Sequence, residues 1–571
     1  MHADTVTAGM RHTSHRLHRR MSPGRGTWAR ALDGLVGRAS GLPPERTDFE
    51  VQRRIQIPTR DGVFLAADHY QPESAAVGTI LIRGPYGRSL PLALPLARLF
   101  AARGYHALFV SSRGTFGSGG TFEPMATEVD DGHDAVAWML DQPWFTGSFA
   151  TIGPSYLGHT QWAILSDPPA EMAAAVISVG PHDFAEHVWG TGAFKLDFLG
   201  WSDGIVHQED IGPVGALVRA VRAGRRVRAA QEGLPLAAAA DGLLEGRAPW
   251  YRDWVTRADT GDDFWLPMRH GAALERADIP VLLIGGWRDL FLEQTVEQYD
   301  RLHDRGTDVA LTVGPWNHYQ AGAARIVTRE TFAWLEQHLA DHPGPPERHR
   351  VHAFLTGAGE WRHLEEWPPP TSPATWYLQP ARPGSAGPGR LRPGAPTDDP
   401  PSRFTYDPAR PTPTVGGPLL SRRCRVDDTV LAGRADVLVF DAGPLSRDLD
   451  VAGSPEAELD HTSDNPHFDL FVRLSEVDPD GRSHNLTEGY RRFGPDRPAA
   501  SPVGIAMAPL YHRLRAGWRL RLLVAGGSFP RFDRNLGTGE PPGTGVSMRP
   551  AQHTVAHGSA RMSKLVLPVV D

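Results

Sequence analysis

The chain of 571 residues has a single cysteine, Cys424, so it can form neither an intramolecular disulfide nor a zinc site made of cysteines. It also lacks a run of about 18 apolar residues, the length that an α-helix needs to cross a bilayer. The N-terminal segment has no apolar core of about 7–15 residues, which a secretory signal requires. We therefore expect a cytoplasmic protein with no membrane partner.

Lysine is the scarcest charged residue. Only Lys195 and Lys564 are present, so arginine supplies nearly all of the positive charge, which we interpret as a coding bias rather than a binding device. The formal net charge of −7 gives no field that favours nucleic acid, so we expect no nucleic-acid partner. Although the chain has 25 histidines, it has no His-Glu-x-x-His helix or other close ligand group. We expect neither a metal nor a cofactor.

Apolar material is plentiful: hydrophobic residues make up 40% of the chain, and 16 tryptophans are present. This composition can build sizeable cores and gives no case for global disorder. At about 150 residues per domain, the length predicts roughly four domains, and two or three larger units are also compatible. We expect residues 1–48 to be a flexible leader, because they are mostly polar, with one weakly amphipathic patch, Trp28–Val36, that could form a short helix.

Apolar runs of strand length alternate with helical stretches from about residue 49, and they resume after a helical block rich in Ala, Arg and Leu. Such alternation is typical of βαβ units with a buried parallel sheet. We predict one α/β domain over residues 49–183 and 270–342, with a helical cap inserted over 184–269. The expected strands include Gly78–Arg83, His106–Val110, Ala150–Gly153, Ala175–Val179, Pro280–Gly285 and Asp308–Val313, and the expected helices include Val129–Leu140, Val214–Glu232 and Leu234–Leu244.

The pattern changes after about residue 342 to short alternating segments between Pro-rich turns. This spacing is typical of an all-β domain. We predict a β-sandwich of the jelly-roll type over residues 343–571. The fold class is therefore α/β, with a hydrolase-like core, an inserted helical cap and a C-terminal all-β domain.

Ser155 lies in the sharpest local motif, a short apolar strand followed by Gly153-Pro-Ser155-Tyr-Leu-Gly158 and a helical continuation. The motif fits a nucleophile elbow, in which a tight turn between strand and helix lifts a serine hydroxyl above the sheet. It departs from the common Gly-x-Ser-x-Gly by one residue, and alone it is a weak signal. A serine nucleophile also needs a histidine base and an orienting carboxylate, in the chain order Ser, Asp, His for this fold.

Asp289 and His318 supply that order, because each directly follows one of the next two predicted strands. Open α/β sheets bind ligands in the loops beyond the carboxyl ends of their strands. Taken singly, Asp289 could cap a helix, and a lone histidine is usually a satisfied polar residue. Three residues of the right types, in order and each after a strand of one sheet, favour catalysis. We predict a triad of Ser155, His318 and Asp289.

Further short motifs accompany these residues, and with them the chain resembles the CocE/NonD group of serine hydrolases. That group includes cocaine esterase, the α-amino-acid ester hydrolases and the X-Pro dipeptidyl peptidases. The resemblance spans about residues 49–571 and implies an active site in the crevice between core, cap and jelly roll. Its marks are Arg83-Gly-Pro-Tyr86, Arg113-Gly114, Gly117-Ser-Gly-Gly120, Glu128, Asp131-Gly132, Gln142-Pro-Trp144, Gly286-Trp-Arg-Asp289, Gly314-Pro-Trp-Asn-His318, Gly359-Glu-Trp-Arg362 and Phe529-Pro-Arg-Phe-Asp-Arg-Asn535.

The resemblance also implies the donors that stabilise the oxyanion of the tetrahedral intermediate, which acyl transfer requires. They would be the hydroxyl of Tyr86 and the backbone N–H of Tyr156. One departure is visible, because the family usually has an acidic residue just before the position of Arg113, where this chain has Ser111-Ser112. A structural hydrogen bond is in question there, whereas the triad is not affected.

The substrate stays open between an ester and a peptide. Relatives that take α-amino acyl groups need carboxylates near the triad, because a buried ammonium must be paired. Here Asp289 is followed by the apolar Leu290 and Phe291, while Asp183 and Glu186 lie near the predicted cap entrance and could reach a cation. We expect cleavage of a carboxylic ester with a neutral or aromatic acyl group. The alternatives are an X-Pro dipeptidyl peptidase and, less favoured, an α-amino-acid ester hydrolase or a catalytically idle binding protein.

Aromatic residues are candidates to line an apolar substrate pocket, although aromatic clusters more often form cores. We expect a small-molecule ester or a short peptide as the binding partner, and a homo-oligomer is also compatible with the sequence. The pocket candidates are Phe194, Trp201, Trp287 and Phe291, followed by the cap residues Phe198, Trp250, Trp254 and Trp265.

Overall fold

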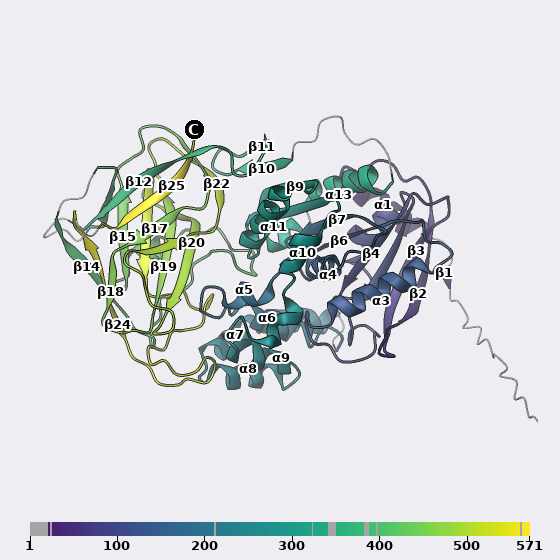
Figure 1. The fold of residues 1–571 in the computed structure, drawn as a ribbon, viewed down its shortest axis with the longest axis horizontal. Helices are drawn as coiled ribbons and strands as arrows, with labels where there is room; N and C mark the ends of the chain where they lie inside the picture. Colours follow the sequence, from purple (N-terminus) through teal and green to yellow (C-terminus); the bar gives the residue numbers. More distant parts are fainter. Residues whose placement is uncertain are drawn as a thin grey trace, which may run out of the picture.

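The computed structural model describes residues 21–22, 25–210, 213–322, 324–340, 350–381, 387–394, 398–559 and 562–571, with side chains described from residue 25 to 210 and again from 223. An α/β unit and an all-β unit lie at opposite ends of the molecule, and a group of helices lies between and beside them (Figure 1). This arrangement confirms the fold class that the sequence predicts.

A mixed sheet of 11 strands forms the α/β unit, in the order β1-β2-β3-β5-β4-β6-β7-β8-β9-β10-β11. From β5 to β10 every neighbouring pair is parallel, and the outer pairs are antiparallel. The strands are β1 Met21–Ser22, β2 Phe49–Pro58, β3 Phe64–Pro72, β4 Gly78–Gly84, β5 Tyr105–Ser111, β6 Phe149–Pro154, β7 Met172–Ser178, β8 Val281–Arg288, β9 Val309–Asn317, β10 Val351–Leu355 and β11 Glu360–Leu364.

Helices cover both faces of this sheet because its central strands are apolar on both sides. Within β4, Ile80 and Ile82 belong to one core cluster and Leu81 to the other. The helices of this unit are α1 Thr27–Ala39, the π-helix Leu94–Arg98, α2 Leu99–Ala101, α3 Glu128–Leu140, α4 Tyr156–Leu165, α10 Gly271–Arg276, α11 Leu292–Asp304, α12 His318–Ala321 and α13 Arg325–His338.

Residues 25–48 differ from the flexible leader that the sequence predicts. Helix α1 contains the expected Trp28–Val36 patch, and it packs against the core through Asp33, which is fully buried. Asp33 pairs with Arg25 at 2.9 Å and with Arg98 at 2.8 Å. Some of the charged residues that suggested a flexible leader therefore form buried ion pairs that hold this segment on the core. The rest of the predicted leader, residues 1–20 and 23–24, lies outside the described residues.

The helical segment between β7 and β8 lies over the carboxyl ends of the strands as a cap, where the sequence predicts one. Its two longest expected helices correspond to α7 and α8. None of the helices in the described ranges is long and apolar enough to cross a bilayer. The cap helices are α5 Phe184–Trp189, α6 Asp197–Ile205, α7 Pro213–Glu232, α8 Leu236–Leu244, α9 Pro249–Thr256 and the 3-10 helix Asp263–Met268.

The all-β unit has a second sheet of 11 strands and a smaller one of three. Its first strand is β12, because β10 pairs in parallel with β9 and extends the α/β sheet beyond the predicted boundary at residue 342. The elements are β12 Thr371–Gln379, β13 Gly389–Arg392, β14 Asp399–Tyr406, α14 Thr429–Ala432, β15 Val437–Ala442, β16 Leu449–Gly453, β17 Glu456–Leu459, β18 His461–Ser463, β19 Phe468–Val477, β20 Ser483–Phe493, β21 Val503–Ala506, β22 Leu510–Leu514, β23 Arg519–Ala525, β24 Ala551–His557 and β25 Lys564–Val570.

Main-chain hydrogen bonds tie the cap to the all-β unit. Leu196 N–H donates to the carbonyl of Arg531 at 2.9 Å, and Asp533 N–H donates to the carbonyl of Phe194 at 2.9 Å. The side chain of Asp533 also accepts from Phe194 N–H at 2.8 Å and pairs with Arg492 at 2.9 Å. The segment that leads into α6 is therefore held by the all-β unit.

Candidate active site

Ser155 occupies the sharp turn between β6 and α4. Its φ of 60° and ψ of −122° are strained for a residue with a side chain, as a nucleophile elbow requires. Ser155 N–H donates to the carbonyl of Ser178 at 2.9 Å and so fixes the turn against β7. A Cβ at Gly158 would lie 2.7 Å from the Cα of Gly180, so the second glycine of the motif allows α4 to approach the end of β7.

His318 and Asp289 lie beside this turn because β8 and β9 are parallel neighbours that end at the same edge of the sheet. His318 Nε2 lies 2.9 Å from Ser155 Oγ, and His318 Nδ1 lies 2.6 Å from Asp289 Oδ2. The Asp289 side chain is fully buried, and its second oxygen accepts from Phe291 N–H at 2.8 Å. The three residues of the predicted triad are thus joined in one chain of hydrogen bonds.

The chemistry of these contacts fixes the direction of each hydrogen bond. An ionised carboxylate only accepts, so His318 Nδ1 carries the proton that it donates to Asp289. His318 Nε2 is then free to accept the proton of the Ser155 hydroxyl. This arrangement can deprotonate a serine as it attacks a carbonyl carbon.

Tyr86 and Tyr156, the predicted oxyanion donors, both lie next to Ser155, and their ring centroids are 6.3 Å apart. Burial raises the pKa of Tyr86 to about 12, and the hydroxyl of Tyr86 has Ser155 and Trp201 as side-chain partners. Tyr156 is the first residue of α4, so its backbone N–H has no acceptor within the helix. The oxyanion role of these two donors stays a prediction.

The hydroxyl of Tyr156 forms hydrogen bonds with residues other than Ser155. It accepts from Met125 N–H at 2.7 Å and donates to Glu128 at 2.9 Å. Ser112, at the departure from the family pattern, also donates to Glu128 at 2.9 Å. The serine therefore contributes a hydrogen bond to the same carboxylate that fixes the ring of Tyr156.

The four predicted pocket residues divide into two groups. Phe291 lies edge-on to His318, with ring centroids 5.5 Å apart, and Trp201 donates its indole N–H to Tyr86 at 3.1 Å. Phe194 is fully buried between Trp189 and Tyr251, so its prediction as a pocket wall is wrong.

Trp287 lines a small cavity together with Asp289, although most of its side chain is buried. Its indole packs on Trp367 with centroids 4.9 Å apart and donates to the carbonyl of Phe354 at 2.7 Å. It belongs to the core cluster on the opposite sheet face from Phe291. The sequence predicts Trp287 as a pocket residue because it lies two residues before Asp289 in the chain. The sheet face on which its side chain lies depends instead on the backbone conformation at the end of β8.

The remaining cap candidates form the core of the cap, the alternative that the sequence left open. They are buried to at least nine-tenths. Of the two acids expected near the cap entrance, Asp183 pairs with Arg269 at 2.8 Å and caps α5, whereas Glu186 is exposed. The buried members are Phe198, Trp250, Trp254 and Trp265.

Asp197 and a loop of the all-β unit also reach the site, and the sequence did not predict either. Burial raises the pKa of Asp197 to about 6, although Arg531, Lys195 and His318 oppose this effect through their charge. The carboxyl of Asp197 accepts from the backbone N–H of Leu420. Asn317, next to His318, donates to the carbonyl of Arg422 at 3.4 Å. No local motif marks these contacts, because the segments are far apart in the chain.

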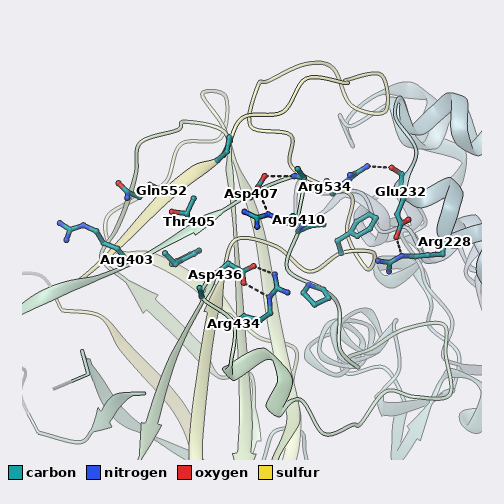
Figure 2. A pocket seen from close by; sticks show the side chains of 17 residues that line it. Arg228, Glu232, Arg403, Thr405, Asp407, Arg410, Arg434, Asp436, Arg534 and Gln552 are labelled. Atoms are coloured by element: carbon teal, nitrogen blue, oxygen red, sulfur yellow. Dashed lines mark hydrogen bonds and ion pairs between the residues drawn. The ribbon is translucent and has the colours of Figure 1, made fainter. Parts of the chain in front are cut away.

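A cavity of about 1260 Å³ lies away from the triad, between α7 and the all-β unit (Figure 2). Its acids are paired with arginines close to them in sequence, for example Asp436 with Arg434 at 2.7 Å and Glu232 with Arg228 at 2.6 Å. Over the described residues, no group of three or more His, Cys, Asp or Glu is arranged to hold a metal ion.

Comparison with known proteins gives consistent matches over both units. Family models for the X-Pro dipeptidyl-peptidase (S15 family) and for its C-terminal non-catalytic domain match residues 61–320 and 345–566. Cocaine esterase from Rhodococcus sp. (strain MB1 Bresler) is 28% identical, over 92% of this chain and 99% of its own.

Two solved structures share the fold over nearly the whole chain. An α-amino acid ester hydrolase superposes with a TM-score of 0.77 at 22% identity, over 92% of this chain and 98% of its own. An aminopeptidase from a marine sediment Thaumarchaeota archaeon superposes with a TM-score of 0.75 at 23% identity, over 92% and 97%.

Proposed function

Because this chain belongs to the S15 and CocE/NonD family of serine hydrolases, we propose that it cleaves a carboxylic ester through an acyl-enzyme formed on Ser155. The observation that carries the proposal is the chain of hydrogen bonds from Ser155 to His318 at 2.9 Å and on to Asp289 at 2.6 Å. A serine hydroxyl is a weak nucleophile at neutral pH. His318 can activate Ser155 because it accepts the hydroxyl proton during the attack.

In the first step Ser155 Oγ attacks the ester carbonyl while His318 Nε2 takes its proton. Asp289 stabilises the imidazolium that forms and keeps the ring in the required tautomer. The carbonyl oxygen becomes an oxyanion, which the hydroxyl of Tyr86 and the backbone N–H of Tyr156 stabilise. His318 then returns the proton to the leaving alcohol, and the C–O bond of the ester breaks.

In the second step water hydrolyses the acyl-enzyme by the same route. His318 takes a proton from the water, the hydroxide attacks the acyl carbon, and the proton returns to Ser155 Oγ. The products are the alcohol from the first step and a carboxylic acid from the second. The two oxyanion donors act in both steps, and removal of one such donor typically costs about 10²–10³ in rate.

A neutral acyl group is supported by the apolar surroundings of His318. Phe291 packs edge-on to the imidazole, and Leu290, which precedes Phe291 in the chain, is buried. An unpaired charge in such surroundings would lose its hydration without compensation.

A second candidate substrate carries an ammonium group on the acyl side, as in an amino-acid ester or an X-Pro peptide. The observation that favours it is Asp197, a half-buried carboxyl that interacts electrostatically with His318. Asp197 forms no ion pair within 4 Å in the described part of the chain, so it could pair with a substrate ammonium.

The test compares p-nitrophenyl propionate with the p-nitrophenyl ester of alanine, which differ only by the α-amino group, and adds Gly-Pro p-nitroanilide. We expect the propionate ester to be cleaved by the wild type and not by Ser155→Ala. Normal turnover of that ester by a folded Ser155→Ala variant would overturn the proposal. A preference for the alanine ester that Asp197→Asn abolishes would favour the second candidate, and anilide cleavage would identify a dipeptidyl peptidase.

A further inference from the structure

The hydroxyl of Tyr86 has two hydrogen-bond partners, and the first of them fixes its direction. Trp201 Nε1 lies 3.1 Å from Tyr86 Oη. An indole N–H can only donate, so the phenol oxygen must accept in this contact. The single proton of Tyr86 is therefore not used in this contact and is available to another acceptor.

Stacking holds the Trp201 indole in place for this contact. One neighbour is Tyr156, whose ring lies 6.3 Å away and within 13° of parallel. Another is Trp254 of α9, whose ring lies 6.3 Å away and within 26° of parallel. Because the hydroxyl of Tyr156 is itself fixed by Met125 and Glu128, the indole rests on a rigid ring next to Ser155.

We propose that Trp201, a cap residue, is a positioning residue for the oxyanion site: by donating to Tyr86 Oη it directs the Tyr86 proton toward the carbonyl oxygen of the substrate. This inference rests on the proposed function, since it assigns a role within the same acyl transfer. It differs from the sequence-based prediction of Trp201 as a pocket wall, because the indole acts through Tyr86.

The direction of the electrostatic effect supports this role. Burial raises the pKa of Tyr86, and the hydrogen bond from Trp201 works against that rise. A phenol that accepts a hydrogen bond is a better donor, because successive hydrogen bonds polarise one another. Without the indole N–H, the Tyr86 hydroxyl could rotate its proton away from the site and would be a weaker donor.

The experiment is a double-mutant cycle between Trp201→Phe and Tyr86→Phe, measured with p-nitrophenyl acetate, butyrate and benzoate. Phenylalanine retains an aromatic ring at position 201 but removes the N–H donor together with part of the bulk of the indole, and the control below accounts for the lost bulk. We expect Trp201→Phe to lower kcat by about tenfold for all three esters, with KM within about twofold, and Tyr86→Phe to lower kcat by about 10²-fold. In the Tyr86→Phe background, Trp201→Phe should cause no further loss.

Trp254→Phe is the matched control, because Trp254 is the neighbouring buried indole and its Nε1 has no hydrogen-bond partner within the described residues. We expect this substitution to leave kcat within about twofold. Should Trp201→Phe reduce the thermal midpoint, Trp201→His provides a second variant, because an imidazole still has an N–H to donate. Its kcat should then lie between those of wild type and Trp201→Phe.

Two results would overturn the inference while leaving the proposed function intact. One is a loss from Trp201→Phe that is fully additive with that from Tyr86→Phe. The other is a change in KM that depends on acyl size, which would make Trp201 a pocket wall. Turnover that persists in Ser155→Ala would instead overturn the proposed function, and this inference with it.

Discussion

Glu128 and Arg83 form a buried ion pair next to the hydroxyl of Tyr156, with Arg83 Nη2 2.7 Å from Glu128 Oε2. Their side chains are 2% and 3% exposed. The second oxygen of Glu128 accepts from Ser112 and Tyr156. One carboxylate therefore links strand β4, the loop after β5 and the residue that follows the proposed nucleophile.

Replacing Glu128 should destabilise the protein strongly. Glu128→Gln keeps the shape of the side chain but leaves the buried guanidinium of Arg83 without a counter-charge, for which we expect a loss of about 3–5 kcal/mol in the free energy of unfolding. Urea denaturation measures this loss. The control is Asp130→Asn, which removes a carboxylate exposed at 66% from its pair with Arg60 and should cause no comparable change. Equal stability of the two variants would contradict the prediction.

Asp289→Asn should remove most of the activity without unfolding the protein. The amide oxygen can still accept from Phe291 N–H, but the amide nitrogen would face His318 Nδ1, so the imidazole would turn to the tautomer that cannot accept the Ser155 proton. We expect kcat for a p-nitrophenyl ester to fall by about 10³–10⁴-fold. Pre-steady-state kinetics should show acylation as the slowed step. A decrease of less than tenfold would argue against Asp289 as the orienting acid.

Asp33 should anchor α1 to the core. Asp33→Ala leaves Arg98 without an acidic partner within 4 Å in the described structure, while Arg25 keeps Glu45 and Asp48. We expect a loss of about 2–4 kcal/mol and faster protease cleavage within residues 27–39, because the helix would detach more often. Limited proteolysis followed by mass spectrometry measures this. Cleavage at the wild-type rate would show that apolar contacts alone hold the helix.

Stability should fall as the pH decreases from about 6.5 to about 4. Burial lowers the pKa of His69 to about 3 and that of His106 to about 4, and the two rings hydrogen-bond at 2.9 Å. Burial likewise lowers the pKa of His461 to about 4 and that of His553 to about 3. The unfolded state binds more protons than the folded state in this range, so acid favours unfolding, and at pH 5 each such histidine costs about 2 kcal/mol.

Urea denaturation at pH 7.5, 6 and 5 checks this prediction. His461→Gln is the informative variant, because its amide can still hydrogen-bond to His553 Nδ1 at the position of the 3.0 Å contact but does not titrate. Its stability should decrease less steeply with falling pH than that of the wild type. A wild-type stability that is unchanged between pH 7.5 and 5 would contradict the prediction.

The strands that carry the candidate triad could be predicted from the sequence because each is a continuous apolar run that ends in a polar loop. β6, β8 and β9 are buried along most of their length, and Ser155, Asp289 and His318 directly follow their ends. The order of three residue types after three strands carries information that no single motif provides.

Other features depend on tertiary contacts that no local pattern encodes. The ion pairs of Asp33 make a polar segment part of the core, and Asp197 meets Leu420 only after the cap and the all-β unit have packed together. The pairing of β8 with β9 shifts register between Gly286 and Arg288, so the face that Trp287 occupies could not be predicted from its distance to Asp289 along the chain.

The hydrogen bonds between Phe194 and Asp533 restrain the movement of this cap segment relative to the all-β unit. A lid that opens and closes needs hinges with few contacts, whereas the segment leading into α6 shares main-chain bonds with a rigid sheet domain. Any movement of this segment away from the all-β unit would have to break the two main-chain hydrogen bonds and the bond from Phe194 N–H to the Asp533 side chain.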